Sequence, residues 1–210
     1  MTAPARIAGE TRDRILDAAC DVIAEHGIDD VRIARIATLA GVSPALVHYH
    51  FATREALLAE ALEHSFELLG DLRTTSADDE GWTAARRLGW MIDQSLPFPG
   101  MGDREWHLWL ELWGQAARRP ELRAVAGRLY ARYDAWMAEV VGEGIAAGEF
   151  TAHDPIAIVQ RLIAAIDGVG LRVLVDDPAM DGPRGRALIV EQLAGELGVE
   201  PAAFDPVEAR

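Results

Sequence analysis

The chain has 210 residues, half of them hydrophobic, so it is long enough to bury a sizeable core in one large domain or two small ones. Its 34 acidic residues outnumber 20 basic ones, all of which are arginine, and the formal net charge is −14. The single cysteine, Cys20, excludes an intramolecular disulfide and cannot hold zinc alone, which favours a reducing compartment. There is no apolar run of roughly 18 residues and no apolar core of a signal peptide, so we expect a cytoplasmic protein with no membrane partner.

Apolar residues recur at the 3.6-residue period of amphipathic helices along the chain, and strand signals are absent. A first helix is predicted over residues 10–25. Two short helices follow on either side of Gly41, and Ser43 begins the second of them as its N-cap. Thr53 caps a longer helix that is expected to end near Gly70.

Proline and glycine residues separate the later helices, which are expected over 82–95, 104–117, 121–147, 155–175 and 185–197. Only the first few residues and about the last ten are expected to be disordered. The predicted fold class is therefore all-α, with about nine helices: an N-terminal three-helix part and a larger C-terminal helical body.

The stretch IARIATLAGVSPALVHYHF has the pattern of a helix-turn-helix, whose second helix presents its outer face to the major groove of DNA. An apolar set locks the two helices together: Ile33, Ile36, Ala37, Val42, Leu46 and Val47. Small or hydrogen-bonding side chains remain on the outer face: Ser43, Pro44, Ala45, His48, Tyr49 and His50. The positions that phosphates would pass carry Arg32, Arg35, Thr38 and Arg54. On spacing alone, the alternative is an ordinary helical hairpin with a polar outer face.

Residues 15–62 resemble the N-terminal domain of the TetR family of bacterial transcriptional regulators. The resemblance rests on Ala18-Ala19, Gly27, Ile36-Ala37, the run AGVS that ends at Ser43, and the aromatic and histidine pair before Phe51. Family members are all-helical homodimers with three DNA-binding helices and a ligand-binding, dimerising body. The resemblance therefore implies a DNA-binding domain over 1–55, a ligand-binding and dimerisation domain over 56–200 and a tail over 201–210.

The same resemblance implies roles for single residues of the helix-turn-helix. Contacts with bases or the nearby backbone are expected from Ser43, Pro44, Ala45, His48 and Tyr49, and contacts with phosphates from Thr38, His50 and Arg54. Two positions depart from the family pattern. His48 stands where tyrosine is usual, which leaves open what this position reads, and Arg54 replaces the usual lysine and keeps its charge.

The strong negative charge lies mainly outside the helix-turn-helix part. Residues 1–55 hold six arginines and eight acids, a net −2, so the other 155 residues carry −12 of the total −14. Charges farther away than a Debye length of roughly 8 Å are largely screened at physiological salt. The acidic composition is therefore compatible with a double-stranded DNA partner.

Aromatic residues concentrate in the middle of the chain, where Trp106, Trp109 and Trp113 share one helical face. Core packing is the plain interpretation, but aromatic walls with a few polar groups also form small-molecule pockets, and tryptophan rings attract cations. The predicted ligand-binding set is Trp90, Gln94, Trp106, Trp109, Trp113, Tyr133 and Asp167.

Asp167 lies in the apolar run IVQRLIAAIDGVGLRVLV, where a carboxylate must be paired or hydrogen-bonded. It could meet a ligand, face a partner arginine, or sit at a helix irregularity beside Gly168. His107 and Glu111 have a spacing that suits metal binding, but two ligands make no convincing site, and a surface pair is the preferred interpretation. We expect no metal and no cofactor.

The last two helices are expected to form a homodimer interface, because the first of them is apolar nearly all round and must be buried on more than one side. Small residues would permit close approach of the partner: Ala164, Ala165, Gly168 and Gly170. The C-terminal part also resembles the BetI-type branch of the family, named for its choline-responsive member. That likeness implies a small organic effector, with cations among the candidate classes.

The leading hypothesis is a homodimeric repressor that a small-molecule effector releases from a palindromic operator. An activator or an effector-independent regulator of the same fold is the alternative. An enzyme is disfavoured, because the sequence has no nucleophile-base set, no metal-ligand cluster and no phosphate loop after a strand.

Overall fold

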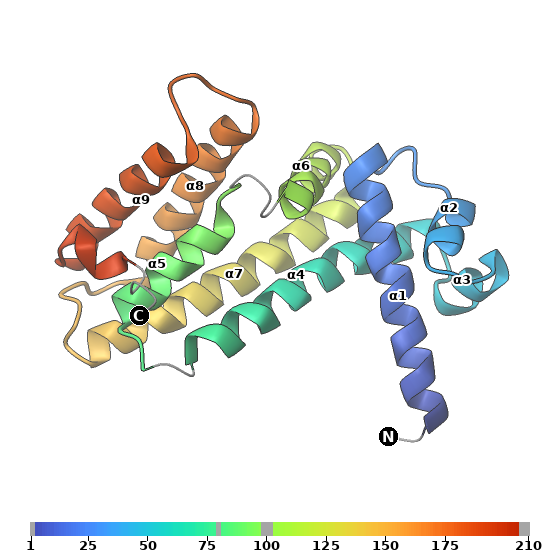
Figure 1. Ribbon diagram of the computed structural model, residues 1–210, viewed down its shortest axis with the longest axis horizontal. Coiled ribbons are helices and arrows are strands. Elements are labelled where there is room, and N and C mark those ends of the chain that lie inside the picture. Colours follow the sequence, from blue (N-terminus) through green and yellow to red (C-terminus); the bar gives the residue numbers. More distant parts are fainter. Residues whose placement is uncertain (1–2, 79–80, 98–102, 206–210) are drawn as a thin grey trace, which may run out of the picture. The chain divides into compact units, whose positions relative to one another are not determined.

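The computed structural model describes residues 3–78, 81–97 and 103–205, with side chains described for 9–66, 81–97 and 104–205. Over these residues the chain forms nine α-helices, one short 3₁₀ helix and no strand (Figure 1), which confirms the predicted all-α class. The helices are α1 (Ala3–His26), α2 (Ile33–Leu39), α3 (Pro44–His50), α4 (Arg54–Asp78), α5 (Ala84–Ser95), α6 (Asp103–Ala116), α7 (Pro120–Ala146), α8 (Pro155–Leu174), α9 (Gly182–Leu197) and η1 (Pro201–Phe204).

Two helices are longer than the sequence pattern predicts. α1 begins at Ala3 rather than at residue 10, and α4 continues to Asp78, so the expected end near Gly70 is wrong. A single glycine lowers helix stability by only about 1 kcal/mol relative to alanine, which good helix formers on either side can offset. Within the described residues, no helix is both long and apolar enough to cross a membrane.

The chain divides into two compact units, each made of two segments. The first unit comprises Met1–Leu72 and Arg104–Leu129, and the second comprises Arg73–Asp103 and Tyr130–Arg210. α4 and α7 therefore contribute residues to both units.

The first unit has one apolar core to which α1, α2, α3, α4, α6 and α7 all contribute. Its fully buried members include Ile15, Leu16, Ile23, Ile36, Val47, Leu58, Leu62, Leu108 and Leu112. Cys20 belongs to this core, and its thiol donates to the Ala61 carbonyl at 3.0 Å. Burial raises the pKa of the Cys20 thiol to about 11, so this thiol stays protonated at neutral pH.

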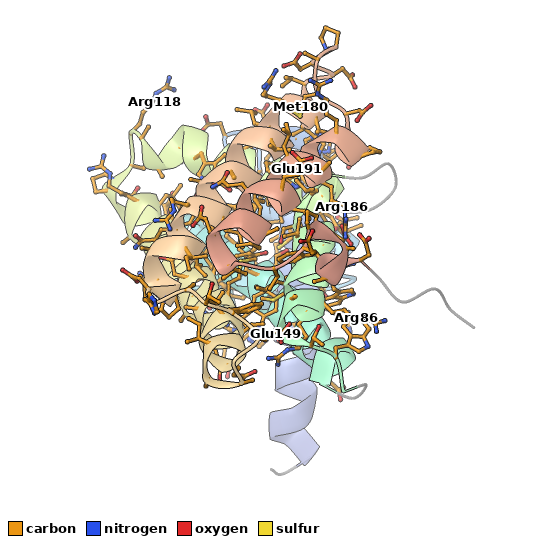
Figure 2. All side chains as sticks on the ribbon, turned by 90° about the vertical axis from the view of Figure 1, so that its left-hand side faces the viewer. Arg86, Arg118, Glu149, Met180, Arg186 and Glu191 are labelled. Carbon is orange, nitrogen blue, oxygen red and sulfur yellow. The ribbon has the colours of Figure 1, made fainter. Side chains whose placement is uncertain are left out.

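The second unit packs α8 beside α9, with α5 and η1 against them (Figure 1). Its core includes Leu88, Met91, Ile92, Val159, Leu193 and Leu197. Glu149 lies at the start of α5 (Figure 2), where its carboxylate accepts hydrogen bonds from the amides of Ala84 at 2.9 Å and Ala85 at 2.8 Å. These bonds satisfy helix-terminal donors that have no partner within the helix.

The expected disorder of the last ten or so residues is wrong for 201–205. The Phe204 side chain is completely buried, and its carbonyl accepts a hydrogen bond from Arg186 of α9 at 3.1 Å. Arg186 also holds the Asp93 carboxylate of α5 at 2.5 Å. An apolar anchor and a charge-assisted hydrogen bond together order this segment; residues 206–210 lie outside the described part.

Candidate nucleic-acid interface and aromatic residues

The helix-turn-helix forms as the sequence predicts. Gly41 adopts a φ of +65° in the turn, which is the left-handed region that side chains disfavour. The Val42 amide donates to the Ala37 carbonyl at 2.9 Å, and the Ser43 hydroxyl accepts from the Leu46 amide at 3.2 Å as the N-cap of α3. Ile36, Ala37 and Val47 are buried, so α3 is seated with a fixed outer face.

That outer face is open to solvent over most of its length. Exposed side chains on it are Ser43, Pro44, Ala45, His48 and Tyr49. Tyr49 is 81% exposed and stands edge-on to the half-buried His50, with ring centroids 5.4 Å apart. An exposed aromatic side chain on a short, firmly seated helix is available for an external partner.

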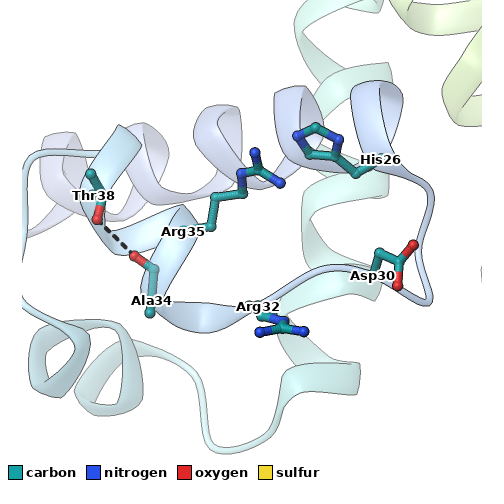
Figure 3. Close-up of a pocket in the computed structure, with 6 residues that line it drawn as sticks. All are labelled: His26, Asp30, Arg32, Ala34, Arg35 and Thr38. Carbon is teal, nitrogen blue, oxygen red and sulfur yellow. Dashed lines mark hydrogen bonds between the residues drawn. The ribbon is translucent and has the colours of Figure 1, made fainter.

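A polar cleft of about 610 Å³ lies beside α2. Its lining residues are His26, Asp30, Arg32, Ala34, Arg35 and Thr38 (Figure 3). The Arg35 side chain extends from α2 toward His26 (Figure 3), and neither Arg32 nor Arg35 forms an ion pair within the described residues. The sequence patterns did not point to His26, the last residue of α1, or to Asp30 in the loop that follows it.

Two other predicted phosphate contacts already have partners inside the first unit. The Thr38 hydroxyl donates to the Ala34 carbonyl at 2.9 Å (Figure 3). The Arg54 guanidinium donates to the carbonyls of Val31 at 3.1 Å and Asp29 at 3.3 Å, and also to that of Ile28. A phosphate contact from either side chain would compete with these bonds, whereas Arg32 and Arg35 face no such competition.

Two acidic residues of α1, Asp17 and Asp21, have partners within the unit. Arg104 lies 3.0 Å from the Asp21 carboxylate and 3.9 Å from that of Asp17, and His64 lies 3.4 Å from Asp17. Arg12 of the same helix pairs with Glu60. Arg104 therefore offsets part of the negative potential of α1 that DNA would otherwise meet.

The three tryptophans of α6 form one aromatic cluster, as their spacing predicts. Ring centroids are 6.0 Å apart for Trp106 and Trp113, 5.5 Å for Trp109 and Trp113, and 4.5 Å for Trp109 and Phe66. The cluster is attached to the core of the first unit, which supports the packing interpretation. The Trp113 indole N–H is buried without an acceptor among the described residues, however, and such a donor is satisfied when water or a ligand supplies an oxygen.

The other predicted ligand-binding residues lie in the second unit. Trp90 and Gln94 are half-buried on α5, and Tyr133 is edge-on to Trp136 on α7. The Asp167 carboxylate accepts a hydrogen bond from the Tyr130 hydroxyl at 2.6 Å. Burial raises the pKa of Asp167, and the Tyr130 bond opposes that rise. The polar partner of this carboxylate is therefore a tyrosine rather than the arginine that we considered.

The preferred interpretation of His107 and Glu111 as a surface pair needs revision for Glu111. His107 is exposed, but the Glu111 carboxylate accepts a hydrogen bond from the Ile28 amide at 2.9 Å. In the part of the chain with described side chains, no three His, Cys, Asp or Glu residues come together as a metal site.

Two short helices joined by the turn at Gly41, the second seated on the core with an exposed outer face, place the chain in the helix-turn-helix class of DNA-binding proteins. Residues 15–61 match bacterial regulatory proteins of the tetR family, and residues 84–198 match the C-terminal region of BetI-type transcriptional repressors. The chain belongs to the TetR family of bacterial transcriptional regulators and carries a BetI-type C-terminal region. Members of this family are DNA-binding regulators with a ligand-binding domain, not enzymes.

Curated relatives and solved structures agree with this assignment. The chain is 28% identical over 195 residues to the HTH-type transcriptional regulator BetI of Brucella canis, covering 91% of this chain and 94% of the relative. It is 31% identical over 163 residues to the BetI regulator of Rhizobium meliloti, covering 77% and 76%.

Two solved structures share the fold. A candidate transcriptional regulator from Saccharomonospora viridis, solved in complex with choline, has a TM-score of 0.76 and 31% identity over 89% of this chain and 96% of that one. A candidate TetR-family regulator from Rhodococcus sp. has a TM-score of 0.79 and 26% identity over 90% and 99%.

Proposed function

We propose that the protein is a homodimeric repressor that binds a palindromic operator and is released when a small organic effector binds its C-terminal domain. The observation that carries the proposal is the exposed outer face of α3 in a chain whose 84–198 region matches BetI-type repressors. The partner is double-stranded DNA, so we also expect the protein in the cytoplasm.

For DNA binding, we assign the outer face of α3 to the major groove and Arg32 and Arg35 to phosphates on either side. Both arginines line the polar cleft beside α2 and are free to turn toward a phosphate. Base contacts would come from Ser43, Pro44, Ala45, His48 and Tyr49. Thr38, His50 and Arg54 remain proposed phosphate contacts, but Thr38 and Arg54 must share or exchange their present hydrogen bonds.

Dimerisation is supported by an exposed apolar seam along α8 and its C-cap residue, Val175. Ala164, Gly168, Leu171 and Val175 follow one another at spacings of four, three and four, and all are exposed, Val175 by 64%. A seam with this spacing is what a partner helix covers. Leu188 of the neighbouring α9 is also 44% exposed, and Glu191 lies on the outward side of the same helix (Figure 2). By contrast, Gly170 is buried inside the unit and does not belong to the seam.

The dimer assignment is tested by Leu171→Arg. In a twofold interface each protomer contributes the same residue, so the substitution would bury two unpaired positive charges. The expected product is a monomer by light scattering at micromolar concentration. Glu139→Arg on the exposed side of α7 introduces the same side chain away from the seam and should leave the dimer intact. A dimeric Leu171→Arg variant would exclude this interface.

For the effector, we propose a small organic cation, and choline is the first probe because the related structure from Saccharomonospora viridis contains it. Tryptophan rings stabilise quaternary ammonium groups by cation–π attraction. The positions to test are Trp90, Gln94, Trp106, Trp109, Trp113, Tyr133 and Asp167. The buried Trp113 N–H could donate to a ligand hydroxyl.

Calorimetry with choline and its neutral isostere 3,3-dimethylbutan-1-ol tests the cationic class. A cation–π site should favour choline by roughly 2 kcal/mol, or about thirtyfold in Kd. Equal affinities for the two compounds would mean that the effector is not recognised as a cation.

The regulatory role is tested in two steps. Selection from a random duplex library should yield a site with twofold symmetry, and the effector should release the protein from it. Deleting the gene should then raise transcription of the genes next to that site, and a fall would indicate an activator instead.

A further inference from the structure

The loop between α1 and α2 (residues 27–32) leads directly into the proposed DNA-contacting surface. Gly27 ends α1 with a φ of +75°, and α2 begins at Ile33. Arg32 occupies the N-cap of α2 but makes no side-chain capping hydrogen bond. The start of α2 is therefore not held by the side chain of its N-cap residue.

Two apolar anchors fix the inner side of the loop. Ile28 is fully buried and Val31 is 4% exposed, and both belong to the core of the first unit. Hydrophobic anchors of this kind hold the loop against the core but do not by themselves fix the orientation of its peptide groups.

Helix α6 supplies the first polar contact. Its Glu111 carboxylate accepts the Ile28 amide at 2.9 Å, directly after the left-handed turn at Gly27. A Cβ at Gly27 would lie 3.3 Å from one carboxylate oxygen and 3.4 Å from the other. Glycine thus serves both the backbone conformation and the close approach of Glu111.

Two further contacts, one from the last turn of α6 and one from the segment between α6 and α7, hold the next residue. The Asp29 carboxylate accepts from the Gln115 amide at 2.9 Å and from the Arg119 guanidinium at 2.6 Å. These hydrogen bonds, that from Gln115 first, lower the pKa of Asp29. Asp29 is therefore ionised and engaged at neutral pH, although its side chain is exposed.

The opposite side of the loop is held from α4. Arg54 donates hydrogen bonds to the main-chain carbonyls of Ile28, Asp29 and Val31, so all three residues are held through their backbone. The loop is thus held by Glu111, Gln115 and Arg119 on one side and by Arg54 of α4 on the other. Its last residue is Arg32, and Arg35 follows in the first turn of α2.

We propose that Glu111 and Gln115 of α6, with Arg119 just before α7, are positioning residues for operator binding, which act by fixing the loop 27–32 and hence the start of α2. The proposal rests on the DNA-binding role assigned above, and it adds residues far from the helix-turn-helix in sequence. None of the three is expected to touch DNA. Their effect passes through the backbone of residues 28–31 to Arg32, Arg35 and the seat of α3.

Electrostatics alone predicts that removing the carboxylates of Asp29 and Glu111 strengthens DNA binding, whereas the proposed positioning role predicts that it weakens operator binding. The two effects can therefore be told apart. Removing the carboxylate of Asp29 or Glu111 takes a negative charge away from the DNA-binding unit, so it should strengthen binding to a polyanion. Loss of the positioning contacts should instead weaken it. Asp13 is the matched control, because it is an exposed acid of the same unit with no hydrogen bond or ion pair among the described residues.

The experiment measures affinity of the full-length protein for its selected operator and for a random duplex. Asp29→Ala and Glu111→Ala should lose on the order of tenfold in operator affinity, the size expected for one or two lost charge-assisted hydrogen bonds per protomer. Affinity for the random duplex should be unchanged or higher. Asp13→Ala should bind the operator as tightly as the unmodified protein or more tightly, and Glu111→Gln, which keeps an acceptor oxygen, should restore most of the loss.

A purely structural role is separated by two further measurements. Gln115→Ala changes no charge and removes one exposed contact, so it should keep the melting temperature yet weaken operator binding severalfold. Hydrogen exchange of the Ile28 amide should be slow in the unmodified protein and faster in Glu111→Ala, and this readout needs no DNA.

The outcomes separate the two proposals. If no sequence is bound specifically while the Ile28 amide is protected through Glu111, the DNA-binding role fails and the loop contacts stand. Fast exchange of that amide in the unmodified protein overturns the positioning role. The positioning role is also overturned if Asp29→Ala and Glu111→Ala bind the operator with the same affinity as Asp13→Ala.

Discussion

Gly89 of α5 is the position where one added methyl group should be felt most in the second unit. A Cβ at Gly89 would lie 2.0 Å from the Phe204 carbonyl oxygen, 2.8 Å from its carbonyl carbon and 3.0 Å from its Cα. All three are backbone atoms, so rotation of a side chain cannot relieve the clash. Gly89→Ala must therefore move η1 away from α5.

The loss of stability expected from Gly89→Ala can be estimated from the burial of Phe204, the last residue of η1. Loss of the contacts of a fully buried phenylalanine costs about 3–5 kcal/mol, and alanine in a helix is worth about 1 kcal/mol more than glycine. The expected net loss is about 2–4 kcal/mol in the free energy of unfolding of the second unit. Gly142→Ala on α7 is the control, because its Cβ would meet open space and the change should be neutral or stabilise by up to about 1 kcal/mol.

Urea unfolding should be combined with hydrogen exchange of peptides from α5 and η1, because a chain of two units need not unfold in one transition. In the Gly89→Ala background, Phe204→Ala should add little, since the same contact has already been lost. The reasoning is refuted if Gly89→Ala is as stable as Gly142→Ala, or if the losses from Gly89→Ala and Phe204→Ala add in full.

The hydrogen bond from Tyr130 to Asp167 and the two arginines beside the cleft of α2 can each be tested by one substitution. Tyr130→Phe removes the donor that opposes the raised pKa of Asp167, and it should cost about 1–3 kcal/mol at pH 7. Because the folded-state pKa lies above the ordinary value of 3.8, the stability that this carboxyl contributes is present at acid pH and is lost as the pH rises through the folded-state pKa. The loss in Tyr130→Phe, measured by urea unfolding, should therefore shrink on acidification, and a pH-independent loss would contradict the reasoning. For DNA binding, Arg32 and Arg35 in two protomers should contribute about −3.6 to the slope of log affinity against log salt, and Arg32→Ala should reduce its magnitude by about 1.8. An unchanged slope would show that Arg32 does not contact phosphate.

Local chemistry explains why most of the helices could be predicted. Ser43 and Thr53 cap their helices through the amides of Leu46 and Ala56, and Gly41 forms the turn between α2 and α3, as their residue types indicate. The buried and exposed faces of the helix-turn-helix follow from helical periodicity, which depends only on neighbours along the chain. These features need no knowledge of distant segments.

What could not be predicted depends on pairs that are far apart in sequence. Asp167 finds its donor 37 positions away at Tyr130, and Glu111 finds an amide 83 positions away at Ile28. The order of residues 201–205 had one available signal, the lone aromatic Phe204 near the C-terminus, but its pocket beside Gly89 has no local signature. Such contacts are set by tertiary packing, which spacing rules do not represent.

The first unit is interrupted in sequence: Met1–Leu72 is completed only by Arg104–Leu129. Its core joins Ile15 and Leu58 to Leu108, Leu112 and Val125, so part of the apolar surface that stabilises the DNA-binding helices is supplied after an intervening stretch of the chain. A chimera that transfers operator specificity between relatives should therefore exchange both segments of this unit, Met1–Leu72 with α4 included and Arg104–Leu129, rather than the first three helices alone. Natural recombination that exchanges only the N-terminal helices would leave this core mismatched, which favours joint inheritance of both segments.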